Sequence, residues 1–245
     1  MRRRGHVRPA GARDIGRRFG YNLTLMSSEH LLLAAMAPIA YLLGSVPFGL
    51  LVGLSRGVDV RKGGSGNIGA TNVGRLLGGR FFALVFTLDL LKGLLPMLTA
   101  GLVVYGGSSA TYDAATFALW LGVGLGAILG HMFSVFLKFQ GGKGVATSAG
   151  VILGLYPFFT LPAVVTAIVW LIAFAIWRYV SVASLMAAVA FPIAYAALGH
   201  AMGWPITGAQ LPLLLFACLV SALVVVRHRN NIARLRKGTE HGFGR

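Results

Sequence analysis

Long apolar stretches alternate with short polar ones along most of the chain. A bilayer core about 30 Å thick is crossed by roughly 20 apolar residues of α-helix. Stretches of this length and character predict five membrane-spanning helices, at residues 31–54, 81–104, 114–137, 182–200 and 209–226. The pattern therefore predicts an all-α, polytopic integral membrane protein.

A further apolar block, residues 145–177, is interrupted by Tyr156-Pro157 and Leu161-Pro162. It fits either one long bent helix or two short ones. Loop charge decides between them, because Lys and Arg concentrate in cytoplasmic loops. Placing both Lys143 and Arg178 in the cytoplasm requires the block to cross twice. We expect about seven transmembrane helices, the fourth and fifth short, with the N-terminus outside and the C-terminus cytoplasmic.

The first 25 residues conflict with this orientation, because they hold seven arginines and should resist translocation. Either the first segment is oriented wrongly, or translation begins at Met26. The pattern favours the second interpretation, with residues 1–25 as a basic N-terminal extension upstream of the true start. Residues 26–245 are then a single membrane-embedded domain. The extension also lacks the layout of a signal peptide.

Composition agrees with a membrane protein. The mean hydropathy is +0.76, and 11% of residues are charged, against about 25% in soluble domains. The net charge of +16 would suggest nucleic acid in a soluble protein, but in so apolar a chain it indicates membrane topology. The six acidic residues are scattered and no His/Cys spacing suits zinc. We expect no metal, no cofactor and no nucleic-acid partner.

Two glycine-rich blocks stand out among the polar segments. Residues 63–75 (GGSGNIGATNVGR) combine glycines, which let a ligand approach backbone N–H groups, with Ser, Asn, Thr and Arg donors. They predict a phosphate cradle, and a flexible loop is the alternative. Residues 140–147 (QGGKGVAT) place Lys143 at a helix N-terminus, which attracts anions. There the alternative is a tight turn carrying one lysine. Neither block has the spacing of a P-loop.

Polar residues also occur in the tail and in the second segment. His228 and Asn231 share a face if the last segment continues as a helix, although this region equally fits a basic flank that binds anionic lipid. Asp89 and Lys92 lie on one face of a predicted span, where an unpaired charge is costly. They are expected either to pair with each other or to line the polar site, and the pattern favours the structural pair.

The third segment carries the stripe Gly122-xxx-Gly126-xxx-Gly130, a pattern that lets membrane helices pack closely. His131 follows it and fits either a structural or a functional role. Ser181, near the start of the sixth segment, adds a hydrogen-bond donor at another predicted cytoplasmic corner.

Five motifs, in order, resemble those of the bacterial acyl-phosphate:glycerol-3-phosphate acyltransferase family: residues 44–49 (GSVPFG), 63–75, 89–93 (DLLKG), 130–147 and 228–240. The resemblance runs from about Leu33 to Glu240. It implies a multi-pass enzyme of the bacterial cytoplasmic (inner) membrane, with its active site facing the cytoplasm. The implied reaction moves a fatty acyl group from acyl phosphate to the 1-hydroxyl of glycerol 3-phosphate. Lysophosphatidic acid and phosphate are the products, in the first step of bacterial phospholipid synthesis.

The resemblance and the motifs together assign roles to single residues. Ser65 and Arg75 are expected to bind and orient phosphate, and Lys143 with its loop is expected to bind glycerol 3-phosphate. The residues expected to be catalytic are Ser65, Arg75, Lys143, His228 and Asn231. Those expected to bind substrate are Gly64, Gly66, Asn67, Thr71, Gly141, Gly142, Gly144 and Ser181. Structural roles are expected for Asp89, Lys92, His131 and Glu240. The partners are the two phosphorylated substrates and membrane lipid.

We expect the glycerol hydroxyl to attack the acyl carbonyl directly, because acyl phosphate is already activated and orientation supplies much of the rate. His228 is expected either to act as general base or to hold a substrate phosphate that accepts the proton. Two other classes fit part of the pattern. One is a transporter of phosphorylated solutes, which would also use broken helices and intramembrane charges. The other is a non-catalytic lipid-binding scaffold.

Overall fold

A computed structural model describes residues 28–106 and 112–242. The expected extension, residues 1–25, lies outside them. The described residues are helical, without strands. The helices are α2 (Ser28–Ser45), α3 (Phe48–Leu54), α4 (Ala70–Leu77), α5 (Gly79–Gly106), α6 (Ala114–Met132), a 3-10 turn (Val135–Leu137), α7 (Val145–Gly154), α8 (Thr160–Trp177), α9 (Val180–Ala201), α10 (Leu211–Arg227) and α11 (Arg229–Arg236).

Five described segments have the length and hydropathy of membrane spans: Ser28–Leu54, Gly79–Gly106, Ala114–Leu137, Thr160–Trp177 and Val180–Ala201. α10 meets the same criterion when α11 is counted with it across a 54° bend. These segments coincide with the predicted ones, so the prediction of an all-α membrane protein is confirmed. The number of crossings and the orientation stay predictions.

The block at residues 145–177 forms two helices, as expected. α7 has 10 residues, which is about 15 Å at 1.5 Å per residue, or half a bilayer core. α8 has 18 residues and the length of a span, so only the first of the two is markedly short. Pro162 lies in the first turn of α8, where its missing N–H interrupts no intrahelical hydrogen bond.

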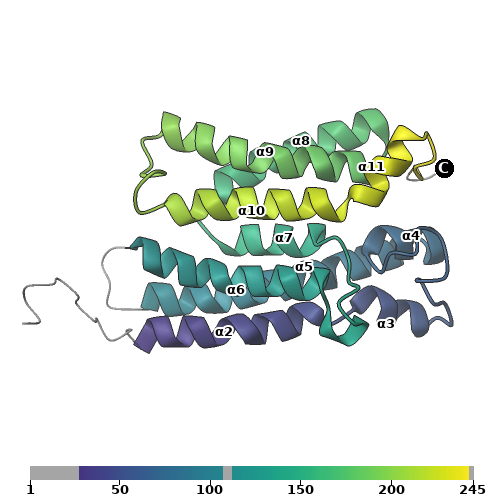
Figure 1. The fold of residues 1–245 in the computed structure, drawn as a ribbon, viewed down its shortest axis with the longest axis horizontal. Helices are drawn as coiled ribbons and strands as arrows, with labels where there is room; N and C mark the ends of the chain where they lie inside the picture. Colours follow the sequence, from purple (N-terminus) through teal and green to yellow (C-terminus); the bar gives the residue numbers. More distant parts are fainter. Residues whose placement is uncertain (1–27, 107–111, 243–245) are drawn as a thin grey trace, which may run out of the picture.

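The helices form two layers with α7 between them (Figure 1). One layer holds α2 to α6 and the other holds α8 to α11. α7 packs mainly on α5. The contact is close because a Cβ at Gly93 of α5 would collide with the carbonyl of Thr147, and one at Gly150 of α7 with the carbonyl of Leu90. The short helix is therefore fixed to the first layer.

The predicted glycine stripe of α6 packs against α2 at two of its three positions. A Cβ at Gly126 or Gly130 would collide with the backbone carbonyl of Ala37 or Tyr41. The prediction is wrong at Gly122, which faces open space. The contact is centred nearer the polar end of α6 than the sequence period suggested.

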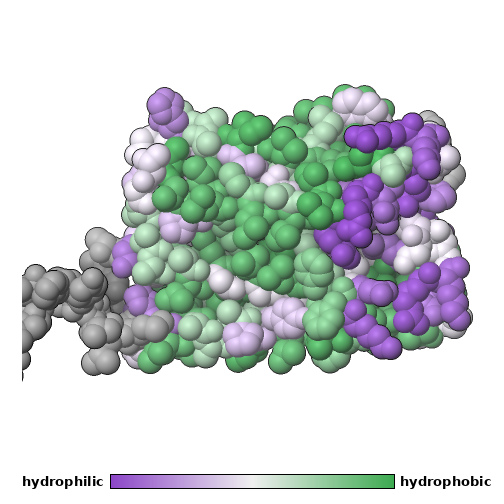
Figure 2. Space-filling view, viewed as in Figure 1, coloured by the Kyte–Doolittle hydropathy of each residue, from purple (hydrophilic) through white to green (hydrophobic). Residues whose placement is uncertain are grey.

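On the face that Figure 2 shows, hydrophilic residues gather at one end, beside a broad apolar belt. α3, α4, α11 and the turn between α8 and α9 meet at this polar end (Figure 1), and basic residues such as Arg178, Arg229 and Arg236 lie on these segments. Leu102, Leu171 and Ile193 are among the large apolar side chains exposed in the spans. Such a belt suits contact with lipid tails. The hydrocarbon core of a bilayer offers polar groups no hydrogen bonds, so a surface that faces it is expected to be apolar.

Candidate active site

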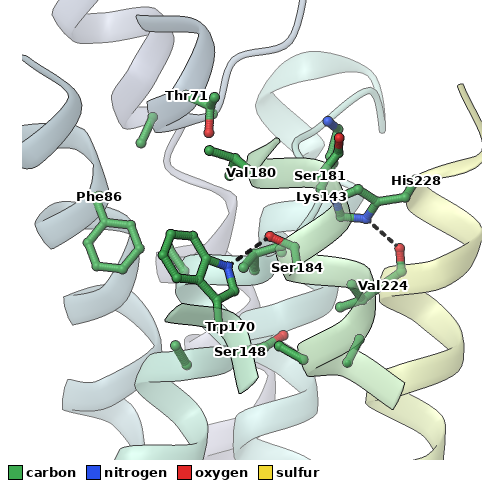
Figure 3. Close-up of a pocket in the computed structure, with 18 of the residues that line it drawn as sticks. Thr71, Phe86, Lys143, Ser148, Trp170, Val180, Ser181, Ser184, Val224 and His228 are labelled. Atoms are coloured by element: carbon green, nitrogen blue, oxygen red, sulfur yellow. Dashed lines mark hydrogen bonds between the residues drawn. The ribbon is translucent and has the colours of Figure 1, made fainter. Parts of the chain in front are cut away.

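A cavity of about 550 Å³ lies between the two layers and extends from the polar end into the apolar belt. Figure 3 shows Thr71, Ser181, Lys143 and His228 at its mouth, with Phe86 and Trp170 deeper in. The polar lining includes Ser65, Asn67, Thr71, Arg75, Lys143, Ser181, His228, Asn231 and Glu240. The apolar lining includes Phe86, Ile152, Trp170, Phe191 and Val220.

Four predicted substrate-binding glycines, Gly64, Gly66, Gly141 and Gly142, do not line the cavity, whereas Gly144 does. Gly64 and Gly66 have φ of +56° and +68°, a backbone conformation that residues with a side chain rarely adopt. Their contribution is the shape of the first loop, which presents Ser65 between them.

The first loop is shaped by Asn72, which is buried on α4. Its Oδ1 accepts a hydrogen bond from the Ser65 backbone N–H at 2.8 Å. Its Nδ2 donates to the carbonyls of Val60 at 2.9 Å and Gly63 at 3.1 Å. One amide thus holds three points of the loop against the helix.

Arg75 extends from α4 toward the C-terminal tail. Its Nη2 donates to the His241 carbonyl at 2.9 Å, while its Nε is buried and has no hydrogen-bond partner among the residues that the structure describes. Burial lowers the pKa of Arg75, yet an arginine stays charged in proteins. Arg75 lines the cavity and contributes positive charge to it.

The second loop places Lys143 between the layers. Gly144 has φ of +81° and precedes the first residue of α7. Gly142 lies against the His131 ring, and its N–H donates to the His131 carbonyl at 3.0 Å. Burial lowers the pKa of Lys143 to about 8, with Glu240 opposing the shift and Arg234 adding to it. Lys143 is therefore a cation near neutral pH and loses that charge under mildly alkaline conditions.

A smaller cavity of about 120 Å³ adjoins this loop. It shares four lining residues with the larger cavity and adds three arginines. The shared residues are Ser65, Asn67, Lys143 and Asn231, and the arginines are Arg227, Arg229 and Arg234. Cations therefore outnumber acidic groups at the mouth of the site, which favours anionic ligands.

His228 lies at the bend between α10 and α11, so the last segment does not continue straight as the shared-face argument assumed. Its Nδ1 is 2.7 Å from the Val224 carbonyl (Figure 3). A carbonyl only accepts, so Nδ1 carries the proton of the neutral ring and Nε2 remains an acceptor. Burial, assisted by the charge of Lys143, lowers the pKa of His228 to about 4. The imidazole is therefore neutral at physiological pH.

Glu240 brings the tail back onto the bundle. Its carboxylate accepts hydrogen bonds from Ser181 at 2.8 Å, Asn231 at 2.6 Å and Arg234 at 2.8 Å. Burial opposes ionisation, but these donors lower the pKa of Glu240 below its ordinary value. These contacts hold the tail against α9 and α11, and the anchoring role of Glu240 stays a prediction. The Asn231 Oδ1 is buried and has no hydrogen-bond partner in the described part of the chain.

Asp89 and Lys92 form the predicted pair within the second span. Lys92 Nζ is 2.9 Å from Asp89 Oδ1 and also donates to the Val46 carbonyl at 2.9 Å. His131 joins them, with Nδ1 at 3.5 Å from the same carboxylate oxygen. All three are buried. They lie directly beneath the second glycine loop, because the His131 ring contacts Gly142.

Comparison with known proteins assigns this arrangement to a family. The family model for glycerol-3-phosphate acyltransferase matches residues 34–238, a range that holds every residue of the site except Glu240. The chain belongs to the glycerol-3-phosphate acyltransferase family. It is therefore an acyltransferase, as the five motifs suggested.

Related acyltransferases match the chain over most of its length. The glycerol-3-phosphate acyltransferase of Geotalea daltonii is 46% identical, covering 90% of this chain and 100% of its own. That of Trichlorobacter lovleyi is 45% identical, covering 83% and 94%. That of Aquifex aeolicus is 44% identical, covering 83% and 95%.

Two solved structures of an acyltransferase share the fold. Both are crystal structures of PlsY (YgiH), an integral membrane glycerol 3-phosphate acyltransferase. The glycerol 3-phosphate form has a TM-score of 0.71 and 41% identity, covering 88% of this chain and 96% of that one. The lysophosphatidic acid form has a TM-score of 0.69 and 40% identity, covering 88% and 95%.

Some parts of the acyltransferase site were not singled out from the sequence. Asn72 lies within the first motif, and an amide soon after a glycine loop was the available signal. Trp170 lines the deeper cavity, and its indole Nε1 donates to the hydroxyl of Ser184 at 3.3 Å (Figure 3). No motif marks this contact, since it depends on how α8 packs against α9.

Proposed function

We propose that this acyltransferase moves a fatty acyl group from acyl phosphate to the 1-hydroxyl of glycerol 3-phosphate. The products are lysophosphatidic acid and phosphate, at the start of bacterial phospholipid synthesis. One observation carries the proposal: a single cavity has a cationic mouth and a long apolar interior. That combination fits one ligand with a phosphate head and an acyl tail, together with a second small phosphorylated ligand.

The mouth of the cavity supplies the groups that phosphate requires. Arg75 and Lys143 provide positive charge, and Ser65 provides a donor. Charge-assisted hydrogen bonds to phosphate are about twice as strong as neutral ones. Asn67, Thr71, Gly144 and Ser181 line the same region and complete our proposed binding set. We propose that the other predicted glycines, Gly64, Gly66, Gly141 and Gly142, act by shaping the loops.

The interior of the cavity suits the fatty acyl chain. From Ser181 at the mouth to Phe191 at depth, α9 rises about 15 Å at 1.5 Å per residue. Phe86, Trp170 and Val220 line the space between. Burial of apolar surface there stabilises the bound donor by roughly 25 cal/mol per Å².

The proposed reaction is direct acyl transfer. The glycerol hydroxyl oxygen bonds to the acyl carbon, and the bond from that carbon to the phosphate oxygen breaks. Phosphate leaves with the electron pair of this bond, while Arg75 and Lys143 neutralise its charge. Orienting the two substrates in one site supplies a large share of the rate, about 7 to 11 kcal/mol in favourable cases.

The hydroxyl proton goes to His228 Nε2 or to a phosphate oxygen of the substrate. The neutral imidazole with its free Nε2 can accept a hydrogen bond from the hydroxyl. A pKa of about 4 makes it a weak base near neutral pH, since general bases work best with a pKa near the operating pH. This favours a substrate phosphate as the final acceptor, with His228 and Asn231 orienting the hydroxyl.

We further propose that residues 26–245 are one membrane-embedded domain of the bacterial cytoplasmic membrane. The polar end, which carries the mouth of the cavity, then faces the cytoplasm. The basic loops at this end support that orientation through the positive-inside rule. Ser65 and Glu240 reach one site from distant parts of the chain, which supports a single domain.

The proposal is tested with purified protein in detergent, supplied with palmitoyl phosphate and glycerol 3-phosphate. We expect lysophosphatidic acid and phosphate in equal amounts. Samples without glycerol 3-phosphate control for hydrolysis, and palmitoyl coenzyme A tests the choice of donor. Transfer from the thioester alone would contradict an acyl-phosphate donor. Uptake of glycerol 3-phosphate into proteoliposomes without acylation would favour a transporter, and lipid binding without turnover would favour a scaffold.

A further inference from the structure

Arg227, the last residue of α10, contacts the second glycine loop across the two layers. Its Nε donates to the Gly142 carbonyl at 3.0 Å, and its Nη2 donates to the Gly141 carbonyl at 2.7 Å. The guanidinium also lies over the Phe133 ring, 5.2 Å from its centroid. Two adjacent carbonyls and one aromatic ring therefore fix the position of this side chain.

The loop is held from the opposite side by the end of α6. The N–H of Gly142 donates to the His131 carbonyl at 3.0 Å, and that of Gly141 donates to the Met132 carbonyl at 3.2 Å. Each of the two glycines thus donates to α6 and accepts from Arg227. Lys143 is the next residue along the chain, so the direction of its side chain depends on this double attachment.

His228 directly follows Arg227 in the sequence, and Asn231 lies about one helical turn further on. Arg227 therefore connects two parts of the site that belong to different layers, the Lys143 loop in the first and the start of α11 in the second. The hydrogen bond from Arg75 to the His241 carbonyl also links the first layer to the C-terminal tail at the site.

We propose that Arg227 is a positioning residue, which sets the distance between Lys143 and the His228–Asn231 pair. This inference rests on the proposed function. Arginine suits the task because its Nε–H and Nη–H groups form a rigid fork that reaches two acceptors at once. A lysine carries the same charge but offers a single flexible ammonium.

The first test measures kinetics of Arg227→Lys. We expect kcat to fall by about 10- to 100-fold, the scale associated with a displacement of 1 Å in a site. KM for palmitoyl phosphate and for glycerol 3-phosphate should change by less than about threefold, because charge is kept at the mouth. Arg236→Met removes a charge from the exposed face of α11 and serves as the control, with unchanged kcat.

Wild-type kcat in Arg227→Lys would overturn the proposal. A raised KM for one substrate at unchanged kcat would also overturn it, because Arg227 would then bind phosphate directly.

The second test does not depend on turnover. Amide hydrogen exchange is measured on the substrate-free full chain, in the peptide that covers residues 140–147. Loss of the fork should speed exchange in this segment about tenfold or more, because its local opening becomes easier. Exchange in α9 should stay unchanged. Unaltered exchange at residues 140–147 in Arg227→Lys would overturn the proposal even if activity fell.

A third measurement covers the case in which Arg227→Lys does not fold, judged by thermal unfolding. Phe133→Leu then keeps the arginine and removes the ring beneath it. Faster exchange at residues 140–147, by about threefold, is expected. Amide exchange at the wild-type rate at residues 140–147 in Phe133→Leu would overturn the proposal that this ring helps to hold Arg227 in position. A wild-type protein that makes no lysophosphatidic acid would refute the proposed function, whereas the exchange result would still decide whether Arg227 fixes the loop.

Discussion

Lys143 illustrates how burial and charge act on one residue of the site. Its ammonium lies between the layers, close to other cations, and its pKa falls to about 8. His228, its neighbour across the cavity, is neutral for the same reasons. A cation beside a neutral imidazole suits the proposed binding of phosphate, because the imidazole adds no further permanent charge. The sequence indicated both residues, but it could not indicate their ionisation, which depends on burial.

The pH dependence of the reaction should follow from Lys143. In the proposed mechanism the protonated form of Lys143 binds phosphate, so kcat/KM should fall as pH rises through about 8. Lys143→Arg stays charged at all accessible pH values, so its alkaline decline should disappear, although its rate will be lower. Rates are measured from pH 6 to 10 and corrected for spontaneous hydrolysis of acyl phosphate. Lys138→Arg, at an exposed lysine outside the cavity lining, is the control. A decline near pH 8 that persists in Lys143→Arg would assign it to another group.

At the scale of the helices, the contact between α6 and α2 is tested by a matched pair of glycine substitutions in α6. Gly130→Ala should lower the midpoint of thermal unfolding, since the added methyl would collide with the Tyr41 carbonyl. Gly122→Ala has open space around its Cβ and should be neutral or stabilising, because alanine favours helix by about 1 kcal/mol over glycine. Equal effects of the two substitutions in lipid nanodiscs would contradict the close contact described for Gly130.

The depth of the cavity along α9 should determine the preferred acyl chain. The Phe191 ring lines the deep end and packs edge-on against Phe159, with ring centroids 5.0 Å apart. Phe191→Ala should raise the ratio of rates for stearoyl over lauroyl phosphate about tenfold. Poor fit of one methylene group in an apolar pocket typically changes the relative rate by about this factor or more. The ratio is independent of how much enzyme is folded. Phe216→Ala, in the same aromatic cluster but outside the cavity lining, should leave the ratio unchanged. A change of the ratio in Phe216→Ala as well would contradict a specific role of Phe191 at the deep end of the cavity.

Hydropathy predicted the helices far better than it predicted their packing. The spans follow from apolar length, and the division at residues 145–177 follows from loop charge. The 54° bend at His228 could not be foreseen, because nothing in the local sequence breaks the helix there. In the sequence, Arg227 is one of several basic residues that follow the last predicted span. Its hydrogen bonds to the second glycine loop depend on how the two layers pack. Asn72 likewise gains its three partners only through the fold.

Orientation in the membrane is a property of the whole molecule, and cysteine labelling measures it. In a Cys218→Ser background, we expect Gly208→Cys to react with a membrane-impermeant maleimide in intact cells. Lys237→Cys, at the opposite, polar end, should react only after permeabilisation. The reverse pattern would place the mouth of the cavity outside the cell and contradict a cytoplasmic site.

α8 has one further consequence for how the enzyme meets its substrates. This helix packs mainly on α9, with 11% of its span buried, so the wall of the cavity is itself a lipid-facing helix. A donor dissolved in the bilayer needs to diffuse only in two dimensions to reach that wall, while glycerol 3-phosphate arrives from water. The saturation of the enzyme with acyl donor should then follow the donor's mole fraction in the membrane, and diluting the vesicles should matter only for the water-soluble substrate.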